Sequence, residues 1–135
     1  MSDKIVELLN HALVMEYSDV FLYPRHGEYF GKHPAIAELF KNFSQMELRH
    51  ADTLAIEISQ LGGQPVWDFQ LLTGKKRPEE IVHWHLDSER NAISHYEKCI
   101  RAASDKRLKE ILSDIKAEET IHQAALEKIS EWIKS

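Results

Sequence analysis

Apolar residues recur at alternating steps of three and four along four stretches of the chain, the spacing of a helix face that is buried against other helices. The first stripe is looser than the other three, which keep the pattern over their whole length. The stripes consist of Ile5, Leu9, Ala12, Val20 and Tyr23; Ile36, Phe40, Phe43, Leu54, Ile58 and Leu61; Val82, Leu86, Ile93, Tyr96 and Ile100; and Leu108, Leu112, Ile115, Leu126, Ile129 and Ile133. The pattern predicts an all-α fold, a bundle of four amphipathic helices.

Helix boundaries follow from caps and helix breakers. The first helix is expected from about Asp3 to about Phe30, with Pro24 kinking it or ending it early because proline cannot donate to the carbonyl of Val20. Residues 31–33 form a short turn, and a second helix runs from Pro34 to the Gly62-Gly63 pair. The third begins at Pro78, and the fourth runs from a turn at residues 104–105 nearly to Ser135.

The lengths of the connections predict the topology. The short links around residues 31–33 and 104–105 make two antiparallel hairpins, whereas the link of about 16 residues between them, 62–77, can run the length of the bundle. This link also contains Val66, Trp67, Phe69, Leu71 and Leu72. We expect these side chains to cover a flank of the bundle or, alternatively, to form a subunit contact. Residues 1–135 are expected to make one domain.

Each apolar stripe is interrupted by ionisable residues that continue its spacing. Glu16 interrupts the first stripe and Glu89 the third, whereas Glu and His interrupt the second and the fourth together, as Glu47 with His50 and Glu119 with His122. A buried carboxylate must be paired, protonated or bound to metal, because leaving it alone and ionised is too costly. Four glutamates and two histidines converging on one layer therefore predict a metal site.

The intervals between these residues repeat. Glu16 precedes Tyr23 by seven residues, as Glu89 precedes Tyr96, and each tyrosine is followed after 24 or 23 residues by E-x-x-H. The chain therefore contains one arrangement twice, and two hairpins related by a pseudo-two-fold axis would bring all six ligands to one central site.

A third E-x-x-H, at Glu80 and His83, tests the specificity of the motif. With 15 Glu and 8 His in 135 residues, chance predicts about one such motif (15 × 8 / 135). The third stripe runs through Val82 and Leu86, which leaves Glu80 and His83 off its centre. We interpret this pair as the solvated first turn of a helix, where acidic residues are favoured.

This ligand set resembles that of the ferritin-like di-iron carboxylate superfamily, in which two helices give one Glu each and two others give Glu-x-x-His. The resemblance covers nearly the whole chain and is strongest to bacterioferritins and the four-helix domain of rubrerythrins. MELRHAD (46–52) is similar to their second-helix motif and EETIH (118–122) to their fourth. The resemblance implies a ferritin-like antiparallel four-helix bundle with one long crossover.

The resemblance also implies a role for each residue. Glu47 and Glu119 would bridge two metal ions, Glu16 and His50 would complete the coordination of one, and Glu89 and His122 that of the other. Tyr23 and Tyr96 would hydrogen-bond to the ligand carboxylates. The alternative is that they are ordinary core tyrosines that reach solvent or backbone. Oxygen and imidazole ligands without thiolate suit iron, manganese or zinc.

Three functions fit this site. The first is oxidation of Fe(II) by O2 or H2O2, the second is peroxide reduction of the rubrerythrin type with an external electron donor, and the third is a non-catalytic bundle stabilised by Zn or Mn that acts as a binding module. Rubrerythrins carry a four-cysteine rubredoxin module and an extra glutamate one turn after the third-helix ligand, where this chain has Ala92, and the chain has one cysteine. These departures favour a di-iron oxidoreductase of the ferroxidase type.

Two further departures concern haem and assembly. Bacterioferritins bind haem through a methionine directly after the second-helix glutamate, and Leu48 occupies this position, so we expect no haem. Ferritin cages use a short fifth helix, which has no counterpart after Lys134. Apolar residues in excess of the stripes, among them Tyr17, Phe21, Phe30, Trp67 and Phe69, favour a homodimer.

Composition limits the classes of partner and the cell compartment that the chain is expected to have. The net charge of −5 argues against nucleic acid. No segment approaches a membrane span, the N-terminus lacks a signal-peptide pattern, and the single Cys99 fits a reducing cytoplasm. Of the remaining histidines, His26 and His33 are expected to be solvated near the first turn, and His85 to be hydrogen-bonded or at the surface. His11 and His95 lie one step off a stripe, and none of the five is a predicted ligand.

Overall fold

The computed structural model describes residues 2–70, 74 and 77–134, which fold into four long α-helices and one short 3-10 helix, with no strand among them. The helices are α1 (Ser2–Gly27), α2 (Pro34–Gln60), α3 (Pro78–Ala102) and α4 (Lys106–Lys134), and the 3-10 helix η1 (Glu28–Phe30) extends α1. These bounds lie within a few residues of those expected from the caps and prolines. The predicted all-α class is confirmed.

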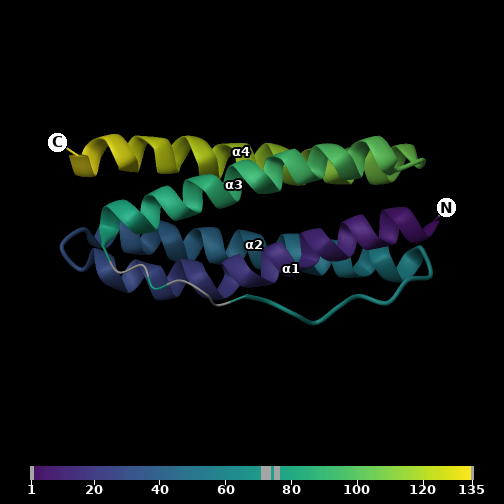
Figure 1. Ribbon diagram of the computed structural model, residues 1–135, viewed down its shortest axis with the longest axis horizontal. Helices are drawn as coiled ribbons and strands as arrows, with labels where there is room; N and C mark the ends of the chain where they lie inside the picture. Colours follow the sequence, from purple (N-terminus) through teal and green to yellow (C-terminus); the bar gives the residue numbers. More distant parts are fainter. Residues whose placement is uncertain (1, 71–73, 75–76, 135) are drawn as a thin grey trace.

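The helices form two antiparallel hairpins, α1–α2 and α3–α4, that lie side by side along the bundle axis (Figure 1). The described part of the link after α2, up to residue 70, passes along the outside of α1 (Figure 1). Hydrogen bonds fix it there: Asn10 of α1 bonds the backbone of Gln64 and Val66, and Ser18 accepts from the backbone amide of Gln70. This is the long crossover of a ferritin-like four-helix bundle, as predicted.

The aromatic residues of the crossover cover the outer flank of α1. Trp67 packs edge-on against Tyr17 at 4.7 Å between ring centroids, and Phe69 lies against Phe21 at 4.8 Å. Trp67 is nevertheless 70% exposed. The flank contact is therefore only partial, and Leu71 and Leu72 lie outside the described residues.

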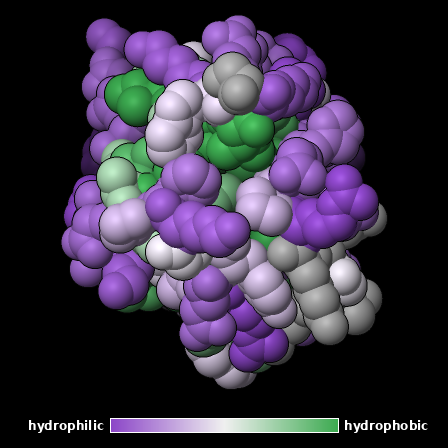
Figure 2. All heavy atoms as spheres, turned by 90° about the vertical axis from the view of Figure 1, so that its left-hand side faces the viewer, coloured by the Kyte–Doolittle hydropathy of each residue, from purple (hydrophilic) through white to green (hydrophobic). Residues whose placement is uncertain are grey.

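Two separate apolar clusters fill the bundle, one toward each end. One contains Leu9 of α1 and Leu54 of α2 with Leu112 of α4, and the other contains Phe30, Phe40 and the later part of α4. At the second end, seen end-on in Figure 2, hydrophobic surface lies between hydrophilic residues. All six predicted ligands lie along the helices between these clusters, so a polar layer is enclosed between two apolar ones.

Pro24 lies inside α1 without ending it, since the helix continues for three more residues to Gly27 before narrowing into η1. The proline leaves the carbonyl of Val20 without its usual helical donor. The hydroxyl of Ser44 on α2 donates to that carbonyl at 2.6 Å. A side chain of the neighbouring helix therefore satisfies the carbonyl and ties α2 to α1 where the helix is weakest.

We predict that Ser44→Ala lowers the free energy of unfolding by about 1–2 kcal/mol, because a part-buried carbonyl loses its donor. In a Pro24→Ala background the backbone amide of residue 24 can donate instead, so the same change should cost clearly less. Urea unfolding of the four proteins measures this coupling, and equal costs in both backgrounds would show that Ser44 does not compensate for Pro24.

Candidate metal centre

The six predicted ligands come together in one buried layer. Glu16 comes from α1, Glu89 from α3, and the two Glu/His pairs from α2 and α4, one turn apart on the inner face of each helix. Every one is at most 3% exposed: Glu16, Glu47, His50, Glu89, Glu119 and His122. The helical spacing of three places each Glu and its His on the same face.

The donor atoms form two groups that share two glutamates. Glu16, Glu47, His50 and Glu119 make one group, and Glu89 and His122 with the same Glu47 and Glu119 make the other. Within each group the candidate donor atoms all lie within 4.8 Å of one another. Glu47 and Glu119 are thus placed to be shared between two ions.

The histidines face this layer with Nδ1. His50 Nδ1 lies 3.1, 3.3 and 3.5 Å from oxygens of Glu47, Glu119 and Glu16. His122 Nδ1 lies 3.5–3.7 Å from oxygens of Glu89, Glu47 and Glu119. Donors about 2.1 Å from one ion and at right angles lie about 3 Å apart, so these separations are close to those of a coordination sphere.

Two tyrosines orient the outer glutamates. The hydroxyl of Tyr23 on α1 donates to Glu89 of α3, and that of Tyr96 on α3 donates to Glu16 of α1. Each bond uses Oε2 of its carboxylate, while Oε1 of both Glu16 and Glu89 has no hydrogen-bond partner. The tyrosines therefore cross-link the two hairpins and fix the direction of each carboxylate.

The buried polar atoms of the layer fit a metal better than any protein partner. Among the described residues, eight such atoms in the layer have no hydrogen bond: Glu16 Oε1, both oxygens of Glu47, His50 Nδ1, Glu89 Oε1, both oxygens of Glu119 and His122 Nδ1. Unsatisfied buried polar atoms are rare, and each costs free energy. All eight are metal donors, and six are carboxylate oxygens, which suits a pair of divalent cations.

Without cations the charges must be compensated by protons. Burial, followed by the charges of neighbouring glutamates, raises the pKa of Glu47 and of Glu119 well above the usual range. Burial alone would lower the pKa of His50, but the nearby carboxylates of Glu119 and Glu16 raise it to about 11. In the metal-free layer these three groups therefore hold protons, which a bound metal ion would displace.

The third E-x-x-H lies elsewhere. The side chain of His83 is 76% exposed and faces Asp87 rather than the layer, and Glu80 is exposed on the first turn of α3. The prediction that this pair sits on a solvated first turn is confirmed.

Asp19 is a buried carboxylate at this layer that the sequence did not single out. It lies on α1 between Glu16 and Tyr23 and is 4% exposed. Burial and the charges of Glu89 and Glu16 raise its pKa well above the usual range. One signal was available, because Asp19 lies one turn after Glu16 and one turn before Tyr23.

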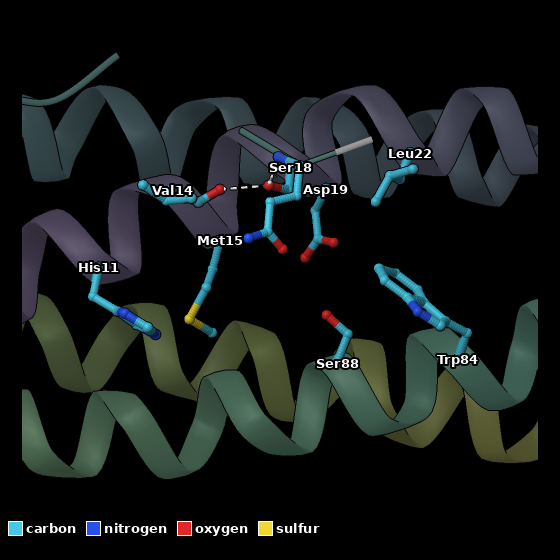
Figure 3. Close-up of a pocket in the computed structure, with 9 residues that line it drawn as sticks. His11, Val14, Met15, Ser18, Asp19, Leu22, Trp84 and Ser88 are labelled. Carbon is cyan, nitrogen blue, oxygen red and sulfur yellow. Dashed lines mark hydrogen bonds between the residues drawn. The ribbon is translucent and has the colours of Figure 1, made fainter. Parts of the chain in front are cut away.

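Asp19 also lines a cavity of about 200 Å³ between α1, α3 and the crossover. Figure 3 shows its carboxylate directed from α1 toward α3, with Ser88 and Trp84 across the space. Met15 and His11 line the same cavity further along α1. The cavity therefore leads from the flank of the bundle to a carboxylate that borders the metal-ligand layer.

The expectation that His26 is solvated is wrong. His26 is 2% exposed and His85 is fully buried, and the two form a hydrogen bond of 2.7 Å between His26 Nδ1 and His85 Nε2. His85 also stacks on Tyr23 at 4.1 Å between ring centroids. His26 is buried because Pro24 does not end α1, which continues far enough to turn this residue toward α3.

The fold and the site define a class, the ferritin-like di-iron carboxylate superfamily. A sequence model of the rubrerythrin family matches residues 7–130, so the chain belongs to the rubrerythrin family. No curated protein matched the chain in a sequence search. None of the described helices is long and apolar enough to cross a membrane.

Solved structures agree on the superfamily. A bacterioferritin of Desulfovibrio desulfuricans, solved with its di-iron site in different catalytic states, is 25% identical with a TM-score of 0.87, over 98% of this chain and 81% of that one. A ferritin-like di-iron carboxylate protein of Bacillus anthracis str. Ames is 26% identical with a TM-score of 0.86, over 96% of both chains.

A third structure supports the fold alone. The bacterioferritin of Rhodobacter capsulatus, with a metal-free dinuclear site and a haem iron, is 24% identical with a TM-score of 0.88, over 98% of this chain and 86% of that one.

We predict that the buried histidine pair makes the fold sensitive to acid. Burial, and then the neighbouring His26, lowers the pKa of His85 well below its usual value. As the pH falls, His85 is therefore protonated in the unfolded chain before it is protonated in the folded protein. Stability should therefore fall as the pH drops below about 6.5. In metal-free protein, wild type should lose about 1 kcal/mol more between pH 7.5 and pH 5.5 than His85→Phe, which keeps the ring against Tyr23.

Chemical denaturation at the two pH values measures this difference. His83→Gln is the matched control, since this exposed histidine should leave the pH dependence of wild type unchanged. Equal losses in wild type and His85→Phe would contradict a neutral buried pair.

Proposed function

We propose that this protein binds two iron ions through Glu16, Glu47, His50, Glu89, Glu119 and His122 and oxidises Fe(II) with O2 or H2O2. The observation that carries the proposal is the set of eight buried donor atoms in one layer that have no hydrogen-bond partner. With peroxide the reaction balances as two Fe(II) and two protons with one H2O2, giving two Fe(III) and two waters. The iron is the electron donor and each Fe(II) gives one electron.

The residues of the chain have distinct parts in this proposal. Glu47 and Glu119 lie in both donor groups and would hold the two ions together. Glu16 with His50 and Glu89 with His122 would each complete one ion. Tyr23 and Tyr96 hold the outer glutamates in position, so that each carboxylate presents one free oxygen.

Small reactants need a route to a buried layer. The cavity beside Asp19 supplies space for Fe(II), oxygen or peroxide next to the site, and the carboxyl oxygens of Asp19 could contact an entering cation. Hydroxyls of Ser18 and Ser88 give it a polar lining. We propose this cavity, shown in Figure 3, as the access path.

The family membership favours a second candidate, peroxide reduction with an external electron donor of the rubrerythrin type. Ala92 argues for the first candidate, since this buried residue packs in an apolar cluster where rubrerythrins have an additional glutamate. A non-catalytic site holding Zn or Mn is the third outcome of the tests below. Leu48, which is 45% exposed on α2, offers no ligand atom, so our prediction for haem stays negative.

We predict that substituting the proposed ligands lowers the metal content, whereas substituting the exposed Glu80/His83 pair does not. Glu47→Ala and Glu119→Ala should lose both ions, because each removes a carboxylate shared by the two donor groups. Glu80→Ala and His83→Ala should keep two metals per chain. Elemental analysis after anaerobic loading and desalting measures this, and equal losses in the two sets would reject our choice of ligands.

We predict that two Fe(II) per chain, loaded without oxygen, are oxidised within seconds of adding O2 or H2O2, whereas Glu47→Ala is no faster than iron in buffer. Absorbance near 300 nm and iron stoichiometry follow the reaction. Fast turnover that requires peroxide together with a reductant would favour the second candidate. Tight Zn binding with no iron oxidation would favour the third.

We predict a homodimer that packs through the outer aromatic cluster of Tyr17, Phe21, Trp67 and Phe69, which are in mutual ring contact. Phe30, also expected on such a surface, is instead buried at 1% exposure in the core. Light scattering should give twice the 15.7 kDa of one chain. Trp67→Glu should give monomers, whereas Ile121→Glu, at an exposed apolar position of α4, should not.

A monomeric wild type would contradict the dimer. A particle of several hundred kilodaltons that retains thousands of irons would contradict it too and would make iron storage the leading function.

A further inference from the structure

The two histidines of the metal layer are supported by different partners. His50 Nε2 donates to Glu118 Oε1 at 2.6 Å, so a carboxylate holds the outer edge of this ring. His122 Nε2 lies 3.3 Å from the thioether sulfur of Met46. Methionine sulfur is only a weak acceptor, whereas a carboxylate forms a charge-assisted hydrogen bond.

The contrast occurs at equivalent positions of the repeated arrangement. Met46 directly precedes Glu47 on α2, and Glu118 directly precedes Glu119 on α4. Each side chain reaches across to the histidine of the other helix. The pseudo-two-fold symmetry of the ligands is therefore broken one residue before each shared glutamate, where one half has a charged group and the other a thioether.

The surroundings of the two imidazole rings also differ, since His122 has an apolar neighbour and His50 a charged one. His122 is stacked on Phe43 at 4.1 Å between ring centroids, so packing with an apolar ring holds it. His50 has a half-exposed carboxylate behind it, since the side chain of Glu118 is 42% exposed. The Nδ1 atom of His50 also lies nearer to the glutamate oxygens, at 3.1–3.5 Å against 3.5–3.7 Å for His122.

A carboxylate on the outer nitrogen of a histidine changes it as a metal ligand. It keeps the proton on Nε2, leaves the Nδ1 lone pair for the ion, and raises the basicity of the ring. Such partners typically change metal affinity by about 10–100-fold. A thioether does this weakly, so the tautomer of His122 is less well fixed.

We propose that Glu118 and Met46 make the two metal positions unequal, so that the first ion binds with Glu16 and His50 and the second, more weakly, with Glu89 and His122. The inference rests on the proposed two-metal function and assigns Glu118 as a positioning residue. The site then fills in order. The ion at the His50 position stays bound, while the ion at the His122 position exchanges more readily.

Anaerobic calorimetric titration of the metal-free 135-residue chain with Co(II), with visible absorbance recorded in parallel, tests the order. Wild type should show two steps that differ by at least about tenfold in affinity. His50→Ala should remove the tighter step and His122→Ala the weaker one. Two equal steps, or the reverse assignment, would overturn the inference.

The partner residues give the sharper test. Glu118→Leu should weaken the tighter step by roughly 10–100-fold and leave the weaker step within about twofold, and Glu118→Gln, which keeps an acceptor oxygen, should fall between. Met46→Glu should strengthen the weaker step by roughly tenfold, bringing the two together. Glu127→Leu, an exposed position of the same helix, controls for the lost charge and should change neither step.

These outcomes separate the inference from the proposed function. Two Co(II) ions bound with equal affinity that Glu118→Leu does not alter would reject the inference and leave a two-metal site in place. Two unequal Co(II) affinities that change as expected on substitution of Glu118 and Met46, in a protein that does not oxidise Fe(II), would support the inference and reject the ferroxidase function. No Co(II) binding at the layer would reject both.

Discussion

Four glutamates enclosed between two apolar clusters repel one another, and this repulsion constrains the rest of the bundle. A hydrophobic core cannot solvate the charges, so each carboxylate needs a cation, a proton or a donor. The two tyrosine hydroxyls satisfy one oxygen of Glu16 and one of Glu89, and the remaining oxygens of the four glutamates have no hydrogen-bond partner. Cations bound in the layer would satisfy these oxygens directly, so that metal binding would also stabilise the fold.

The architecture meets this constraint by duplication. Each hairpin supplies a single glutamate, a tyrosine and a Glu/His pair, and each tyrosine reaches the glutamate of the other hairpin. The hairpins are thereby joined through the site as well as through their apolar faces. Duplication does not extend to the residues around the site, where Glu118 and Met46 differ and where Asp19 on α1 adds a carboxylate beside the cavity.

Much of the fold and of the candidate site could be predicted because both depend on periodicity. The apolar stripes define four helices, and the same spacing places Glu47 and His50 on an inner face while leaving Glu80 and His83 outside. The tyrosine contacts were expected from the family resemblance rather than from the residues themselves. Periodicity could not place residues that depend on how helices end or cross.

His26 shows this limit most clearly. It was expected in solvent because it lies near the turn between the first two helices. Instead α1 continues past Pro24, where Ser44 satisfies the carbonyl that the proline leaves free, and carries His26 into the core against His85. Phe30 was expected on the surface and Asp19 was not singled out for a related reason, since their burial depends on the angle at which α1 meets α3 and on the turn into α2. Such angles come from three-dimensional packing and leave no repeat in the sequence.

The central claim is that two metal ions occupy the layer between Glu47 and Glu119. X-ray diffraction from crystals loaded anaerobically with Fe(II), recorded on both sides of the iron absorption edge, tests it most directly. The account predicts two anomalous peaks between these carboxylates, one near His50 Nδ1 and one near His122 Nδ1. Iron-loaded crystals with no anomalous density in this layer, or with peaks only at surface groups such as His83, would contradict it.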